Sequence, residues 1–272
     1  WLWWFLRFSS AQDSECGRPE VPAFRMLGGE ESLPGRWPWM AGIFITRRDG
    51  TRAFCAGSLI GPRHVLTAAH CARDFRSKCN DCRFDVKLSN FNLESDILSP
   101  VRSFIVVEVH AHPQFDYRLI DTYHDLAIMV LDRTPWRSRY LMPLCLPPPS
   151  VHNDMFEGQN ATMVGWGLTS CTDTPKFPRQ QMQMQITVWG NDDCGRRYSE
   201  PTINSSFICA GDEIGGKTAY LGDSGGPLMI KYDGRWIQIG IVTFGEIETP
   251  YKPTVFTRVT EYMDWIQEII LK

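Results

Sequence analysis

Short apolar runs separated by turn-forming residues make up most of the chain from residue 26 onward. Clear examples are residues 41–45, 104–109, 126–131, 227–230 and 237–244. Such runs, about four to eight residues long and bounded by glycine or proline, are typical of β-strands. Helical periodicity is almost absent here, so the pattern predicts an all-β barrel or sandwich.

Two regions stand apart from this pattern. Residues 147–149 are three prolines near the middle of the chain, and they indicate a crossing between two halves of the fold. Near the C-terminus, apolar side chains recur every three or four residues, which predicts an amphipathic helix with Thr260 as its cap. Those side chains are Tyr262, Trp265, Ile266, Ile269 and Ile270.

Composition narrows the class of protein. The 272 residues suffice for one full-sized core or for two halves that share a cleft. A net charge of -3 gives no reason to expect nucleic acid or an anionic membrane as a partner. Nine cysteines, mostly at long spacings, favour disulfides and an oxidising compartment. Two glycosylation sequons, at Asn160 and Asn204, agree with a secreted, extracellular glycoprotein, although each can arise by chance.

The first 25 residues differ from the rest. Residues 1–6 are apolar but are interrupted at Arg7, far short of the roughly 20 apolar residues that span a bilayer. We interpret residues 1–11 as the remnant of a signal peptide, with a disordered aromatic tail as the alternative. Residues 12–25 are polar, contain three turn-formers and are expected to be a pro-segment, so that residues 26–272 form the functional domain.

Residues 222–227 read Gly-Asp-Ser-Gly-Gly-Pro. Peptide hydrolysis needs a nucleophile, a base, a group that holds the base and donors for the oxyanion. Glycines around Ser224 permit a tight turn that exposes its hydroxyl, and they let the N–H groups of Gly222 and Ser224 point at a substrate carbonyl. A glycine-rich hairpin without chemistry is the alternative, but this hexapeptide arises by chance with a probability on the order of 10⁻⁵.

His70 follows an apolar strand in Thr-Ala-Ala-His-Cys, and Asp125 opens another in His-Asp-Leu-Ala-Ile. Alone, they read as a structural histidine and a strand-edge carboxylate. Together with Ser224, in the chain order His, Asp, Ser, these motifs resemble the chymotrypsin family of serine proteases and not subtilisin-like or α/β-hydrolase triads. The resemblance runs from about residue 16 to the C-terminus. It implies two antiparallel Greek-key β-barrels with the active site in the cleft between them, with His70 as general base, Asp125 fixing its tautomer and Ser224 as nucleophile.

The resemblance also implies that the chain is a zymogen. Arg25-Met26-Leu27-Gly28-Gly29 is similar to the family's activation junction. Cleavage after Arg25 would free the amino group of Met26, which would pair with Asp223 and order the oxyanion loop. Members of the family usually begin with a β-branched residue, but a volume-conserving apolar swap costs under about 1.5 kcal/mol, so activation is expected to survive. A surface arginine in an ordinary loop is the alternative.

Six cysteines match family positions, which implies three disulfides: Cys16–Cys145, Cys55–Cys71 and Cys194–Cys209. The first would keep the pro-segment attached after cleavage. Two common family disulfides are missing, with Tyr220 in one position and Ala161 and Ile230 in another. Cys79, Cys82 and Cys171 are left over, and the odd total leaves at least one thiol free or bonded to another molecule. We expect a Cys79–Cys82 bridge; this pair has a metal-like spacing but no second pair to complete a zinc site.

The primary specificity pocket departs most from the family. Trypsin-like members carry Asp six residues before the nucleophile, where this chain has Thr218. Gly245 would leave the pocket entrance open, and Thr254, in the place of a usual glycine, would narrow it. These residues imply a preference for small or apolar residues before the scissile bond. The family's calcium ligands are poorly reproduced around residues 90–96, so neither a metal nor another cofactor is expected.

The favoured function is therefore a secreted serine endopeptidase that forms an acyl-enzyme. Its expected partners are protein or peptide substrates, an upstream trypsin-like activating protease and protease inhibitors, with no nucleic acid and no membrane. A catalytically idle homologue that acts as a binding module or cascade cofactor is the alternative, because Met26, Thr218 and Thr254 depart from the family. A disulfide-rich adhesion module does not explain the three motifs together.

Overall fold

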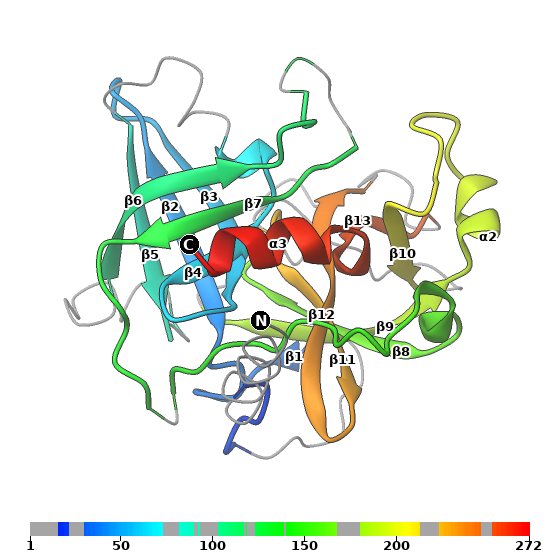
Figure 1. Ribbon diagram of the computed structural model, residues 1–272, viewed down its shortest axis with the longest axis horizontal. Helices are drawn as coiled ribbons and strands as arrows, with labels where there is room; N and C mark the ends of the chain where they lie inside the picture. The colour runs from blue at the N-terminus through cyan, green and yellow to red at the C-terminus, as the bar shows by residue number, and fades with distance from the viewer. Residues whose placement is uncertain are drawn as a thin grey trace, which may run out of the picture.

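The computed structural model describes residues 16–21, 30–72, 82–89, 92, 103–116, 118, 123–138, 140–167, 180–212, 223–245 and 252–272. Within them the chain folds into two closed antiparallel barrels that lie side by side (Figure 1). The predicted class, two antiparallel β-barrels with a C-terminal helix, is confirmed.

Barrel A closes in the order β2-β3-β4-β7-β6-β5. Its strands are β2 (Met40–Thr46), β3 (Arg52–Leu59), β4 (His64–Thr67), β5 (Arg83–Leu88), β6 (Ser103–Ala111) and β7 (Ala127–Leu131). Every residue of β7 is buried, which explains why its sequence is a continuous apolar run and does not alternate. Phe44 on β2 and Phe54 on β3 face each other across the ladder, edge to face at 5.1 Å between ring centroids.

Barrel B closes in the order β8-β9-β10-β13-β12-β11. Its strands are β8 (Asn160–Gly165), β9 (Met182–Trp189), β10 (Phe207–Gly211), β11 (Pro227–Tyr232), β12 (Arg235–Phe244) and β13 (Thr254–Arg258). A short helix, α2 (Asn191–Gly195), precedes β10, and a 3-10 turn at Asn153–Phe156 precedes β8. The three prolines at 147–149 lie in the connection between the barrels.

The first strand and the last helix each contact the barrel that is farther from them along the chain. The short strand β1 (Glu30–Glu31), which precedes barrel A, pairs with β9 of barrel B. Helix α3 (Met263–Ile270), which follows barrel B, lies against barrel A (Figure 1). Its Ile266 and Ile269 are buried in the core shared with that barrel. The expected cap was wrong: Thr260 lies inside a 3-10 turn, Val259–Tyr262, and Tyr262 takes the N-cap position without a side-chain cap.

Buried polar contacts join the two barrels. Ser58 on β3 donates to Gln238 Oε1 on β12 at 2.5 Å, and both residues are fully buried. The indole of Trp39 donates to Met229 Sδ on β11 at 3.0 Å. Because a buried polar group that loses its partner costs about 1–3 kcal/mol, such contacts fix how one barrel lies against the other.

Candidate active site

His70 and Asp125 meet at one end of barrel A. His70 begins a 3-10 turn (His70–Ala72) just after β4, and Asp125 lies just before β7. The ladder pairs Thr67 with Ala127, so the residue that leaves one strand and the residue that enters the other come together. The Asp125 carboxylate accepts from the His70 main-chain N–H at 2.8 Å and lies 2.7 Å from His70 Nδ1.

This geometry fixes how the imidazole can act. Asp125 is 1% exposed, whereas the His70 side chain is 33% exposed. A carboxylate can only accept, so Nδ1 carries the proton that faces Asp125, and Nε2 of the neutral ring is left as an acceptor. An exposed basic nitrogen held in one tautomer by a buried carboxylate is the arrangement that general-base catalysis requires.

Ser224 lies in the loop before β11, held between the two barrels. Its carbonyl accepts from Ala56 N of barrel A at 2.8 Å, and the next residue, Gly225, donates to Val242 O of barrel B at 2.9 Å. Gly225 has a φ of 81°, and a Cβ there would collide with Thr67 Oγ1 and Ala56 O, so the turn requires glycine. The loop is therefore fixed against the segment that carries His70.

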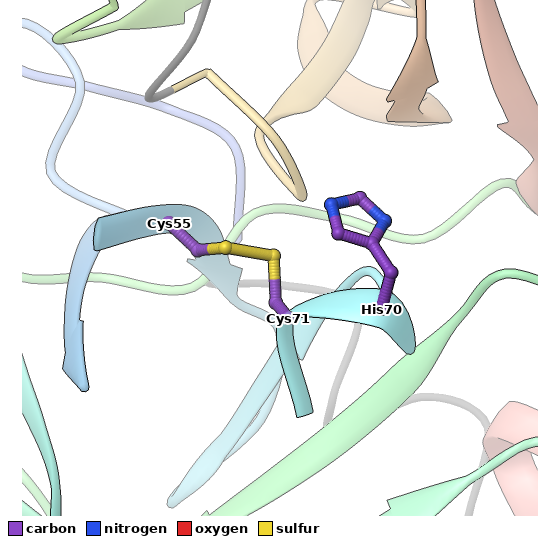
Figure 2. A group of neighbouring side chains, drawn as sticks. All are labelled: Cys55, His70 and Cys71. Carbon is purple, nitrogen blue, oxygen red and sulfur yellow. A yellow bond between two sulfur atoms is a disulfide. The ribbon is translucent and has the colours of Figure 1, made fainter. Parts of the chain in front are cut away.

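The disulfide Cys55–Cys71 lies beside His70 (Figure 2). Ligand-type atoms of Cys55, His70 and Cys71 lie within 4.8 Å of one another. Because the two sulfurs are bonded to each other, they offer no thiolate, the form in which cysteine binds metal. Cys71 Sγ also lies 3.7 Å from Ser224 O. The disulfide thus joins β3 to the turn that begins with His70, and its Cys71 end contacts the Ser224 loop. These three residues therefore do not form a metal centre.

Comparison with known proteins identifies the family. The trypsin family model matches residues 26–266. The chain belongs to the trypsin family. It is 35% identical over 264 residues to the proclotting enzyme of Tachypleus tridentatus, covering 93% of this chain and 68% of that protein. It is 36% identical over 249 residues to a venom protease of Bombus pensylvanicus, covering 88% and 96%.

Solved structures agree with the family assignment. The structure described as "Structure of GrC" superposes with a TM-score of 0.75 at 29% identity, covering 91% of this chain and all of that one. The chain is thus a trypsin-like serine protease by sequence and by fold, and the family supports a hydrolase that acts on protein substrates.

Of the three residues that the resemblance assigns to activation, Arg25, Met26 and Asp223, the structure describes only Asp223. Asp223 is 6% exposed, and its Oδ1 accepts from Gly167 N at 2.8 Å. A Cβ at Gly165 or at Gly167 would collide with this carboxylate, so both glycines leave room for it. Arg25 and Met26 lie outside the described residues, and so does Gly222, which was expected to donate to the oxyanion. An acidic side chain directly before Ser224 is thus already buried.

Two of the three residues expected to form the specificity pocket, Gly245 and Thr254, lie at one end of β12 and β13. Phe244 pairs with Val255, so Gly245 and Thr254 extend the two strands side by side. Thr254 is fully buried, and Gly245 is partly exposed. Thr218 lies outside the described part of the chain. Tyr198 packs against the same end of the two strands. Its hydroxyl donates to Pro253 O at 2.5 Å, and its ring meets the Phe244 ring edge to face.

The structure forms three disulfides at the pairs that the resemblance implied, Cys16–Cys145, Cys55–Cys71 and Cys194–Cys209. Cys82 is disulfide-bonded as well, to a partner outside the described residues. Cys79 and Cys171 also lie outside them. The positions that lack a family disulfide, Ala161 and Ile230, pack together in the apolar core of barrel B.

The two sequon asparagines lie on the surface, where glycosylation requires them. Asn160 and Asn204, the two sequon asparagines, are both exposed. Asn204 Oδ1 accepts from the main-chain N–H of Ser206 at 2.9 Å, a local turn at the surface. No helix among the described residues has both the length and the apolar character needed to cross a bilayer.

Two residues that sequence reasoning missed support Asp125. Thr257 on β13 donates to the Asp125 carbonyl oxygen at 3.0 Å, and Thr243 on β12 lies 2.8 Å from Thr257 Oγ1. All three residues are at most 8% exposed. Thr243 lies in a predicted apolar run, residues 237–244, but nothing in a strand pattern distinguishes a threonine that only packs from one that supports the main chain of another residue.

Proposed function

We propose that this chain is a secreted serine endopeptidase in which His70, Asp125 and Ser224 form the catalytic triad. The observation that carries the proposal is the buried carboxylate of Asp125, 2.7 Å from Nδ1 of a partly exposed His70. The Ser224 loop, fixed against the same segment, supplies the third member.

The reaction follows from these positions. His70 Nε2 takes the Ser224 hydroxyl proton while Oγ forms a bond to the substrate carbonyl carbon. The N–H groups of Gly222 and Ser224 stabilise the resulting oxyanion, a role worth about 3 kcal/mol per donor. His70 then gives the proton to the leaving amine as the peptide bond breaks. Water, activated by the same histidine, hydrolyses the acyl-enzyme and restores Ser224.

The proposal includes activation. Residues 12–25 form the pro-segment and residues 26–272 the protease domain, and an upstream trypsin-like protease cuts after Arg25. The freed ammonium of Met26 pairs with Asp223, whose burial next to Ser224 supports this role. A buried carboxylate needs such a partner, because breaking a buried ion pair costs about 3–5 kcal/mol. The similarity to a protein named a proclotting enzyme also supports a precursor form.

Secretion, glycosylation at Asn160 and Asn204, and regulation by protease inhibitors belong to the same proposal. The three disulfides support an oxidising compartment. Thr254 supports a narrowed pocket that takes small or apolar residues. The alternative, an idle homologue that binds without cutting, is favoured only by the departures at Met26, Thr218 and Thr254.

A fluorophosphonate probe separates the two functions. After cleavage at Arg25 we expect one covalent label, on Ser224, and none in Ser224→Ala, because only a serine activated by a base attacks the probe. A matched control is Ser138→Ala, which changes an exposed serine and should label as the unmodified protein does. Labelling that persists in Ser224→Ala contradicts the triad, and absence of label in the cleaved, folded protein favours the idle homologue.

A further inference from the structure

Arg36 is buried against two indole rings that contact each other. Its side chain lies in the turn before β2, and the residue is 6% exposed. The guanidinium carbon lies 4.8 Å from the ring centroid of Trp37 and 5.9 Å from that of Trp236, and the two rings meet edge to face at 4.9 Å. The faces of tryptophan rings attract cations, most strongly where water is excluded. Burial lowers the pKa of Arg36, which reflects the cost of removing its charge from water.

The buried guanidinium donates to the main chain of the pro-segment. Arg36 Nη1 lies 2.6 Å from the carbonyl oxygen of Val21. Among the described residues, no carboxylate forms an ion pair with Arg36. A buried cation needs hydrogen-bond acceptors to offset its lost hydration. The Val21 carbonyl is therefore an acceptor on which the position of Arg36 depends.

The other end of the same segment is fastened by different contacts. Cys16 is bonded to Cys145, and Gly17 N donates to Pro143 O at 3.0 Å. Trp236 N donates to Gly17 O at 2.9 Å. Gly17 has a φ of 65°, and a Cβ there would collide with Trp236 O. Trp236 thus binds one end of residues 16–21 directly, through its main-chain N–H and Gly17 O, and its ring packs on the arginine that binds Val21 at the other end.

We propose that Arg36, packed against Trp37 and Trp236, forms a clamp that binds the main chain of the pro-segment and holds residues 16–21 on barrel B after the chain is cut at Arg25. The disulfide fixes only Cys16, whereas the clamp fixes Val21, the described residue nearest the cut on that side. The segment stays bound by its own contacts even when the disulfide is removed. The statement about the cut chain rests on the proposed activation; the clamp itself does not.

Two comparisons test the clamp. The first removes the Cys16–Cys145 disulfide in the double variant Cys16→Ser/Cys145→Ser. A trypsin-like protease then cuts the chain at Arg25. Gel filtration and mass spectrometry measure how much of the released peptide stays bound. We expect the peptide to stay bound, and adding Arg36→Met to weaken its binding about tenfold or more, as the loss of one charge-assisted hydrogen bond implies. Adding Arg52→Met, at an exposed arginine on β3, should change nothing. Equal binding with and without Arg36, or complete loss of the peptide when only the disulfide is removed, overturns the proposal.

The second comparison needs no cleavage and keeps the disulfide. Hydrogen exchange of residues 16–21 in the uncut chain should be about tenfold faster in Arg36→Met than in the unmodified protein or in Arg52→Met. Arg36→Lys replaces the Met variant if that variant does not fold, because its shorter side chain leaves the ammonium out of reach of Val21 O. Unchanged exchange overturns the clamp even if the enzyme activates normally. Faster exchange in a chain that is never cut at Arg25 supports the clamp while the proposed activation fails.

Discussion

At the residue scale, a chain of hydroxyls holds the main chain of Asp125. Each threonine hydroxyl has one proton to donate. Thr257 donates to Asp125 O, so in the 2.8 Å contact between the two hydroxyls Thr243 is the donor. The Thr243 hydroxyl also lies 3.2 Å from Ile241 O, so its one proton is shared between Thr257 and a carbonyl of its own strand. Hydrogen bonds aligned in this way reinforce one another in a buried site.

Removing the Thr257 hydroxyl should impair catalysis without abolishing binding. Thr257→Val keeps the shape but leaves the buried Asp125 carbonyl without its donor, a loss of about 1–3 kcal/mol. We expect kcat to fall by roughly ten- to a hundredfold, with KM little changed and the acid limb of the pH–rate profile shifted, because Asp125 holds His70 less firmly. Thr257→Ser, which keeps the hydroxyl, should restore most of the activity. If Thr257→Ser loses as much activity as Thr257→Val, the hydroxyl alone does not account for the loss, and altered packing at this position does.

Residue roles differ in how far sequence reveals them. His70, Asp125 and Ser224 stand in motifs where the chemistry demands particular side chains in a particular order, so the sequence alone is enough to propose them. The partners of Thr257 and Arg36 are main-chain carbonyls, at Asp125 and Val21. Every residue carries a carbonyl, so no side-chain pattern marks these contacts, and only the folded structure brings them together.

At the element scale, the end of β6 packs against the C-terminal helix through aromatic rings. His112, just after β6, stacks on His124 at 5.0 Å between ring centroids, and Trp265 of α3 meets it edge to face at 5.3 Å. The Tyr262 hydroxyl lies 3.0 Å from His124 Nδ1. The sequence predicted α3 from its spacing, but not its first residue, because the preceding 3-10 turn displaces the start to Met263.

This packing predicts how stability depends on pH. Burial and the neighbouring His124 lower the pKa of His112 to about 4, and burial also lowers the pKa of His124. Both folded-state values lie below the unfolded value of about 6.5, so the unfolded chain binds more protons in between. The stability contributed by the neutral rings is complete above about pH 6.5 and is lost as the pH falls toward 4. Tyr262, whose pKa burial raises to about 12, stays neutral in this range.

His112→Phe should therefore flatten the pH dependence. Urea midpoints at pH 7.5, 6 and 5 should fall less steeply than in the unmodified protein, since phenylalanine keeps the ring packing but cannot bind a proton. The exposed residue His152 offers a control, because His152→Phe should keep the original slope. Parallel loss of stability in the unmodified protein and in His112→Phe would show that carboxylates elsewhere account for the acid sensitivity.

At the scale of the whole molecule, the active site depends on how the two barrels meet. His70 and Asp125 come from barrel A, and Ser224 and the threonines from barrel B. Apolar runs alone predicted many strands but left barrel and sandwich open, because ladder partners such as β4 and β7 are far apart in the sequence. The motifs decided between the two through the resemblance. The expected Cys79–Cys82 bridge stays a prediction, since Cys82 is bonded to a partner outside the described residues and spacing alone does not determine disulfide connectivity.

The last prediction concerns whether the enzyme activates itself. Cutting after Arg25 needs a pocket that pairs with a guanidinium, and burying that charge without a partner costs several kcal/mol. Thr254 is fully buried beside Gly245 and adds bulk without charge, and Thr218 also carries no charge. The enzyme should therefore prefer small or apolar residues before the scissile bond and leave its own zymogen uncut.

The test mixes purified zymogen with a trace of activated enzyme and follows the appearance of a new N-terminus at Met26. A trypsin-like protease is the positive control, and the Arg25→Gln zymogen is the negative control. Thr254→Gly should widen the preference toward larger apolar residues. Autocatalytic appearance of Met26, or faster cleavage after Arg than after Ala, Val or Leu, would show that a carboxylate such as Glu246 or Glu248 reaches the pocket.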